Sequence, residues 1–216
     1  MIRDDTEGPL ISMSLKSFIL NVGARSSAPG GGSAAAAIGA IGAGLGSMVG
    51  WMTYGNKKFH GLDKDMRAII PSLHEAMHDL LPMIDADTTA FNQYMVACKL
   101  PKVTEEDKKI REQCMQGAMK TAVAVPMHVA VTINKCWPSM KELANKGNIQ
   151  CKSDIQVGAR SLETALWGAY YNVMINLPQL TDEEFKNKAQ TDIEEALKKA
   201  QDCCKEILAI VEERKE

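Results

Sequence analysis

Apolar residues recur at intervals of three and four along most of this 216-residue chain, which is the spacing of amphipathic α-helices. Alternating runs typical of strands are scarce, and no Asn-Gly or Asp-Gly turn joins two such runs. The pattern predicts helices over residues 14–22, 33–54, 64–100, 104–145, 153–176 and 182–213. We therefore expect an all-α, single-domain bundle of about six helices over 14–216, after a loose leader over 1–13.

The two longest predicted helices contain internal prolines. Proline lacks an amide hydrogen and its ring clashes with the preceding turn, so each one is expected to kink or break its helix. The expected positions are a break at Pro71, kinks at Pro82 and Pro126, and a kink or break at Pro138.

The helix expected over 33–54 is rich in glycine and alanine and carries no charged residue. A glycine inside a helix costs up to about 1 kcal/mol relative to alanine, unless close approach of a neighbouring backbone offsets that cost. We expect a central helix, packed against another helix or against its own copy across a dimer axis. The glycines near one face are Gly39, Gly42, Gly46 and Gly50.

The same segment is long enough to cross a bilayer, which takes about 20 apolar residues. Glycine and alanine drive insertion weakly compared with leucine, isoleucine or phenylalanine. We therefore expect no membrane insertion, and we interpret the segment as a core helix packed so deeply that no face is exposed to water.

Charge and cysteine content narrow the class of protein. The chain holds 25 Lys and Arg against 27 Asp and Glu, so no basic excess points to a nucleic-acid partner. The six cysteines form no Cys-x-x-Cys pair, and the N-terminus lacks the apolar region of a secretion signal. We expect reduced, mostly buried cysteines and a cytoplasmic location.

One acidic residue interrupts an apolar stripe in the helix expected over 64–100. The stripe follows the a and d positions of heptads, and every member except Asp87 is apolar or amphipathic. Burial would raise the pKa of this carboxyl group, which suits proton transfer; a structural cap or an ion pair is the alternative. Asp85 points to the other side of the helix. The stripe consists of Leu73, Met77, Leu80, Ile84, Asp87, Phe91, Tyr94 and Cys98.

A glycine-rich loop, Gly30, Gly31, Gly32 and Ser33, precedes the Gly/Ala helix. It matches neither a Walker loop nor a dinucleotide-binding fingerprint. Its backbone N–H groups, together with the positive end of the helix, could hold a carboxylate or the polar head of a ligand. A flexible turn capped by Ser33 is the plainer interpretation.

His74 and His78 flank Glu75 in the His-Glu-x-x-His pattern of zinc proteases. A metzincin would continue with glycine and histidine at the positions that hold Leu81 and Ile84. We therefore expect no metal site and no zinc chemistry.

Several amides and one carboxylate mark the C-terminal half. Asn148 lies in a loop, Asp154 near the start of the following helix, and Asn172 and Asn176 one turn apart near its end. A buried amide requires hydrogen-bonding partners. The last two asparagines therefore either brace the structure or read the edge of a pteridine-like ligand.

Together these segments resemble the formiminotransferase-cyclodeaminase C-terminal domain family, over nearly the whole chain. The order and spacing of the motifs are more specific than any one of them, and the chain is most similar to the cyclodeaminase half of the animal bifunctional enzyme. The matching segments are 26–36, 52–55, 85–87, 90–91, 100–102, 147–148, 153–154, 168–170, 172–173 and 175–177.

The resemblance implies an all-helical, dimeric domain that binds folate in a cleft near the dimer contact. It implies a cyclodeaminase that converts 5-formimidoyltetrahydrofolate to 5,10-methenyltetrahydrofolate and ammonia, with no cofactor beyond the tetrahydrofolate substrate. The acidic motif would supply the catalytic carboxylate; we assign it to Asp87, with Asp85 second, because Asp87 lies in the core stripe. A methenyltetrahydrofolate cyclohydrolase and a catalytically silent folate-binding domain stay open as alternatives.

The resemblance also implies substrate contacts and partners. The glutamate tail of a folate, single or extended, is anionic, so Lys57, Lys58 and Lys102, together with Arg25, are candidates for binding it. A homodimer or higher assembly is expected, with a formiminotransferase domain as a further partner. The expected substrate-binding residues are Gly30, Gly31, Gly32, Ser33, Lys57, Lys58, Lys102, Asn148, Asp154, Asn172 and Asn176.

Overall fold

The computed structural model describes residues 8–214, and within that range the regular structure is entirely helical. The all-α prediction is confirmed, and the predicted ends of the helices lie within two residues of the observed ones. Three single-turn 3-10 helices occur in the connections: η1 (His60–Leu62), η2 (Ile149–Cys151) and η3 (Leu177–Gln179). The α-helices are α1 (Leu15–Val22), α2 (Gly31–Thr53), α3 (Asp63–Cys98), α4 (Glu105–Lys146), α5 (Lys152–Asn176) and α6 (Glu183–Glu213).

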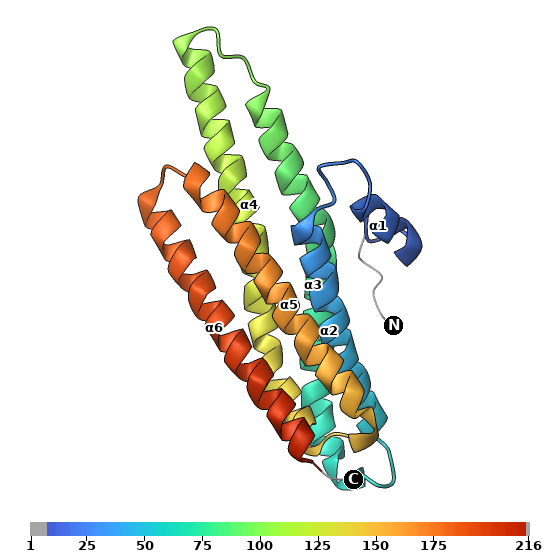
Figure 1. The fold of residues 1–216 in the computed structure, drawn as a ribbon. Helices are drawn as coiled ribbons and strands as arrows, with labels where there is room; N and C mark the ends of the chain where they lie inside the picture. The colour runs from blue at the N-terminus through green and yellow to red at the C-terminus, as the bar shows by residue number, and fades with distance from the viewer. Residues whose placement is uncertain (1–7, 215–216) are drawn as a thin grey trace.

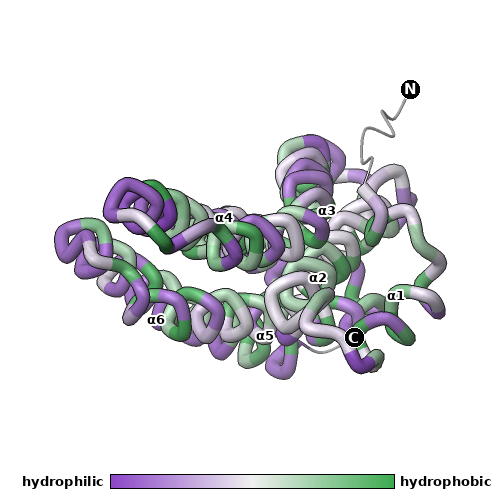
Figure 2. Tube along the Cα trace, turned by 90° about the horizontal axis from the view of Figure 1, so that it is seen from above, coloured by the Kyte–Doolittle hydropathy of each residue, from purple (hydrophilic) through white to green (hydrophobic). Residues whose placement is uncertain are grey.

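Helix α2 lies at the centre of an elongated bundle and packs against α3, α4 and α5. Helices α3 and α4 form a long hairpin whose tip extends beyond α5 and α6 (Figure 1). Helix α6 packs on α4 and α5, while α1 lies to the side of the bundle (Figures 1 and 2). The bundle therefore has one core, built around the Gly/Ala helix.

The internal prolines do not interrupt the helices. Helix α3 is continuous through Pro71 and Pro82, and α4 is continuous through Pro126 and Pro138. The predicted break at Pro71 is therefore wrong. Ile69, Ile70 and Leu73 around it are buried in the core, and their packing offsets a local cost of about 3 kcal/mol.

The glycine face of α2 packs against the other helices of the same chain. A Cβ atom at Gly42 would lie 2.9 Å from the carbonyl oxygen of Gly158 and 3.0 Å from the amide nitrogen of Leu162, so the backbones of α2 and α5 are nearly in contact. Packing against another helix is thus confirmed for this face. Because the face is covered, it is not the one that could meet a second copy.

The opposite face of α2 is exposed, so the expectation that no face sees water is wrong. Helix α2 has the length and mean hydropathy (1.5) of a membrane span, and 61% of its most apolar window is buried. The exposed side chains are apolar: Ile41, Met48, Trp51 and Met52.

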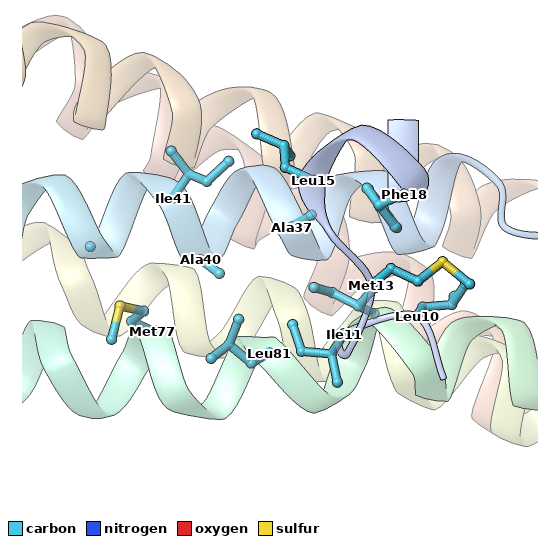
Figure 3. Close-up of a pocket in the computed structure, with 12 residues that line it drawn as sticks. Leu10, Ile11, Met13, Leu15, Phe18, Ala37, Ala40, Ile41, Met77 and Leu81 are labelled. Carbon is cyan, nitrogen blue, oxygen red and sulfur yellow. The ribbon is translucent and has the colours of Figure 1, made fainter. Parts of the chain in front are cut away.

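Part of the leader is packed rather than loose. The backbone N–H groups of Leu10 and Ile11 donate to the two carboxylate oxygens of Asp85, at 2.8 and 3.0 Å, and Leu10 is buried. Residues 1–7 lie outside the described part of the chain. The leader, α1, α2 and α3 line an open apolar pocket of about 330 Å³, into which Met77 and Leu81 project (Figure 3).

Replacing Thr132 by valine is expected to stabilise the protein by about 1 kcal/mol. Thr132 is fully buried in α4, and its hydroxyl has no hydrogen-bond partner among residues 8–214. Valine has nearly the same shape and no polar atom to desolvate. Urea unfolding measures the change; a destabilised variant would show that the hydroxyl has a partner in solution.

Removing the guanidinium of Arg214 is expected to destabilise the protein by about 2–3 kcal/mol, because hydrogen bonds from charged donors are the stronger ones. Arg214 donates to the carbonyl oxygens of Ala144 (2.7 Å) and Gly147 (2.8 Å), where α4 ends. Urea unfolding of Arg214→Met measures the loss. Lys188→Met, which removes an exposed ion pair with Asp192, should change stability by less than about 1 kcal/mol.

Candidate functional site

The carboxylate of Asp87, on α3, caps the first turn of α2. Its Oδ2 accepts a hydrogen bond from the backbone N–H of Ser33 at 2.9 Å and lies 3.1 Å from the Ser33 hydroxyl. That hydroxyl also donates to the carbonyl oxygen of Ile84 at 2.8 Å. A helix N-terminus stabilises negative charge, so the N-terminal turn of α2 is the electrostatic partner of the Asp87 carboxylate.

Gly32 allows the carboxylate to come this close. A Cβ atom at Gly32 would overlap the carboxylate group of Asp87. Helix α2 begins two residues earlier than predicted, and its N-cap, Gly30, makes no side-chain capping bond. The carboxylate held by the glycine-rich loop is thus that of Asp87. Ser33 does not act as the N-cap; it is fully buried beneath Asp87.

The pKa of Asp87 is raised above its ordinary value. Burial of the side chain is the main cause, and the two hydrogen bonds from Ser33 oppose it. The predicted direction of the shift is therefore confirmed. A carboxyl group whose pKa moves toward neutral pH both accepts and returns a proton more readily, which is what general acid–base catalysis requires.

Asp87 opens into a cavity of about 310 Å³ between α3, α4, α5 and the start of α2. Five of the predicted site residues, Gly30, Gly31, Asp87, Asn172 and Asn176, line it together. The remaining lining residues are Ser27, Phe91, Tyr94, Met119, Ala122, Ile175 and Gln179. The cavity combines one carboxylate and several amides with an aromatic and aliphatic wall, a composition typical of small-molecule sites.

Tyr94 and Gln179 meet where α3 approaches η3. The Tyr94 hydroxyl donates to Oε1 of Gln179 at 2.8 Å, and the carbonyl oxygen of Gln179 accepts from Nε2 of Gln116 on α4 at 3.0 Å. Burial raises the pKa of Tyr94, so its hydroxyl stays protonated. Tyr94 and Phe91 belong to the same helical stripe as Asp87, and that spacing could have identified them; no sequence pattern singled out Gln179 or Met119.

Other predicted residues lie elsewhere. Asp85 binds the leader on another side of α3 and does not line the cavity. Lys102 is exposed in the turn between α3 and α4, and Arg25 is exposed in the loop before α2. The geometry therefore separates Asp85 from the chemistry assigned to Asp87.

A second group of predicted residues lies at the opposite end of α2. The backbone N–H of Asn148 donates to Oγ1 of Thr53 at 2.9 Å, and its side chain donates to the carbonyl oxygen of Met52 at 3.3 Å. Asp154 begins α5 nearby, and Lys57 and Lys58 are exposed in the loop after α2. The 23 residues of α2 span about 34 Å at 1.5 Å per residue, so one copy does not bring these residues to Asp87.

The two histidines of the zinc-protease pattern lie side by side. Their ring centroids are 4.6 Å apart, in an edge-to-face arrangement. Within residues 8–214 no third histidine, cysteine or carboxylate joins them to form a cluster that could hold a metal ion.

Comparison with known proteins identifies relatives of the whole chain. The chain is 50% identical over 205 residues to formimidoyltransferase-cyclodeaminase of Gallus gallus, which covers 95% of this chain and 38% of that protein. It is 33% identical to methenyltetrahydrofolate cyclohydrolase of Methylorubrum extorquens, covering 86% of this chain and 89% of that protein. The crystal structure of formiminotetrahydrofolate cyclodeaminase from Thermotoga maritima matches with a TM-score of 0.83 at 28% identity, covering 93% of this chain and 96% of that one.

The similarities agree with one another and with the resemblance seen in the sequence. The chain spans only 38% and 39% of the lengths of the Gallus gallus and Rattus norvegicus proteins. The family model described as formiminotransferase-cyclodeaminase matches residues 14–212, which include the whole bundle and the cavity at Asp87. The chain therefore belongs to the formiminotransferase-cyclodeaminase family.

Proposed function

We propose that this protein is a cyclodeaminase that converts 5-formimidoyltetrahydrofolate to 5,10-methenyltetrahydrofolate and ammonia. The observation that carries the proposal is the half-buried carboxyl group of Asp87, with its raised pKa, at a cavity of about 310 Å³. The names of the relatives and of the Thermotoga maritima structure support it. Asp85, which faces the leader, has no part in this proposal.

The reaction balances with a single proton carrier. N10 of the folate attacks the carbon of the protonated formimidoyl group on N5, forming a tetrahedral carbon that bears an amino group. Asp87, as the carboxylate, takes the proton from N10 and delivers it to the amino group. The carbon–nitrogen bond to that group breaks, ammonia leaves, and the positive charge remains on the methenyl bridge. The chemistry therefore requires no cofactor beyond the folate.

The direct test mixes purified protein with 5-formimidoyltetrahydrofolate and follows ammonia and the absorbance of the methenyl product. We expect the two to appear in equal amounts, faster than in buffer. The absence of ammonia release would end the proposal. Folate binding with neither ammonia release nor loss of added methenyltetrahydrofolate would make the protein a silent binding domain.

Methenyltetrahydrofolate cyclohydrolase is the second candidate, favoured by the 33% identity to the Methylorubrum extorquens enzyme. In that reaction water adds to the methenyl carbon, and a carboxylate such as Asp87 would take the proton from the water. Loss of added methenyltetrahydrofolate above the spontaneous rate, with no ammonia released from the formimidoyl compound, would favour this alternative.

We further propose that the protein acts as a homodimer through the exposed face of α2. Ile41 and Trp51 on that face are 54% and 57% exposed, and Leu15 and Leu20 on α1 are 69% and 64% exposed. Several large apolar side chains exposed on neighbouring elements are typical of a protein interface. A two-fold axis across α2 would bring the far end of one copy, with Lys57 and its neighbours, toward the Asp87 end of the other.

Light scattering on the purified protein is expected to give twice the chain mass of 23.6 kDa. Ile41→Glu combined with Trp51→Glu should give the single-chain mass, because two carboxylates would have to be desolvated at the interface. Val103→Glu is the matched control, since Val103 is 87% exposed in the turn between α3 and α4. A wild type of single-chain mass would refute the dimer.

A formiminotransferase, on the same or another polypeptide, is the proposed source of the formimidoyl substrate, with a single or extended glutamate tail. The names of the animal relatives support that pairing.

We also propose a cytoplasmic location. Cys136 and Cys204 are free, and burial raises the pKa of each thiol to about 12, which suits cysteines that stay reduced.

A further inference from the structure

Asn172 and Asn176 have side-chain amides whose orientation is fixed by the backbone. Nδ2 of Asn172 donates to the carbonyl oxygen of Gly168 at 2.8 Å, and Nδ2 of Asn176 donates across to the carbonyl oxygen of Ala122 on α4 at 3.2 Å. A carbonyl oxygen only accepts, so the nitrogen of each amide must face it. Both residues line the Asp87 cavity.

This orientation leaves two acceptors at the cavity. Among residues 8–214 no hydrogen bond reaches Oδ1 of Asn172 or of Asn176. Neither oxygen is fully enclosed by protein. They are therefore available for donors of a bound molecule.

A backbone donor lies close to the amide group of Asn172. Nδ2 of Asn172 lies 3.6 Å from the position of a Cβ atom on Gly31, the first residue of α2. The N–H groups of a first helical turn have no partner within their helix. The cavity wall thus combines two carbonyl acceptors from α5 with a backbone donor at the start of α2.

We propose that Asn172 and Asn176 accept hydrogen bonds from the 2-amino group and N3–H of the pterin ring, beside the Gly31 N–H that binds its 4-oxo group. The inference rests on the proposed function only in taking a folate as the ligand. A pterin edge presents donor, donor and acceptor, which complements this wall. A site built to bind such donors rejects an analogue that lacks them, because its own polar groups stay unpaired.

The test compares 5-formyltetrahydrofolate with its 2-desamino analogue by titration calorimetry, for wild type, Asn172→Leu and Asn176→Leu. Losing one hydrogen bond of about 1.5 kcal/mol raises Kd about tenfold. We expect each variant to bind the amino ligand about tenfold more weakly, and the wild type to bind the analogue about tenfold more weakly. The variant whose asparagine accepts from the 2-amino group should bind the analogue nearly as the wild type does, because that group is absent from it. The other variant, which loses the bond to N3–H, should be about tenfold weaker than the wild type for both ligands.

A control variant and turnover kinetics separate recognition from folding and from catalysis. Asn145→Leu is the matched control, because its Nδ2 donates to the carbonyl oxygen of Lys141 one turn back, as that of Asn172 does to Gly168, and it lies away from the cavity; its Kd should not change. In turnover, Asn172→Leu and Asn176→Leu should raise KM and leave kcat within about threefold. Asn176→Ser replaces Asn176→Leu if the latter fails to fold.

Equal weakening of both ligands in both variants would overturn the inference, as would a wild type that binds the two ligands equally well. A wild type that discriminates at the 2-amino group but releases no ammonia would support the inference and refute the proposed function.

Discussion

Asp87→Asn is expected to lower kcat for ammonia release by at least about 10²-fold, the smallest usual contribution of a general acid–base group. Asparagine keeps the shape and can still accept from the Ser33 N–H, but it cannot take a proton from N10. Folate binding should stay within about threefold of wild type, since the carboxylate acts in the transition state. Steady-state kinetics and titration calorimetry provide the two measurements.

The stability of the same variant separates catalysis from folding. The folded-state pKa of Asp87 is raised, so this group stabilises the fold below its unfolded pKa and loses that contribution as pH rises through the folded value. At neutral pH Asp87→Asn should therefore be at least as stable as wild type in urea. Asp85→Asn is the matched control, with near-normal kcat expected; loss of activity in that variant alone would transfer the catalytic role to Asp85.

Gly42→Ala is expected to destabilise the protein by about 2–3 kcal/mol, the usual cost of overpacking a core. The added methyl would lie 2.9 Å from the carbonyl oxygen of Gly158 and 3.0 Å from the backbone nitrogen of Leu162. Backbone atoms cannot rotate away, so α2 and α5 must separate. Urea unfolding gives the loss of stability. Because α5 also carries Asn172, a displaced α5 should weaken folate binding as well.

Gly117→Ala isolates the intrinsic preference of the helix for alanine. Gly117 lies within α4, and a methyl there would meet nothing within 4 Å. This substitution should stabilise the protein by up to about 1 kcal/mol. If both glycine variants were stabilised, α2 and α5 would not be in backbone contact.

Helical periodicity was enough to predict the bundle, because each long helix buries one apolar stripe. The expected break at Pro71 failed because a local preference of about 3 kcal/mol competes with the burial of Ile69, Ile70 and Leu73. The water-exposed face of α2 was missed for another reason. A run of glycine and alanine interrupted by large apolar residues has the same composition whether one face is covered by the same chain or left open.

The candidate site was predicted in part. Asp87 interrupts an apolar stripe at the point where the stripe changes its surroundings. Before Asp87, Ile84 is buried in the core; after it, Phe91 and Tyr94 line the cavity. Asn148 matches a family motif as well as Asp87 does, and Lys57 is adjacent to one, yet both lie at the far end of α2. The order of motifs along a chain does not specify which of them lie together in space. Only the packed bundle shows that the residues near Asn148 are far from those near Asp87.

The pH dependence of kcat, measured for wild type and Asp87→Asn, tests the central claim that Asp87 carries the proton. The carboxylate is the active form, so kcat of the wild type should rise with pH through one ionisation above the ordinary carboxyl pKa, because burial raises the pKa of Asp87. The residual activity of Asp87→Asn should lack that ionisation. The same ionisation in both proteins would contradict the account and assign the proton transfer to another group.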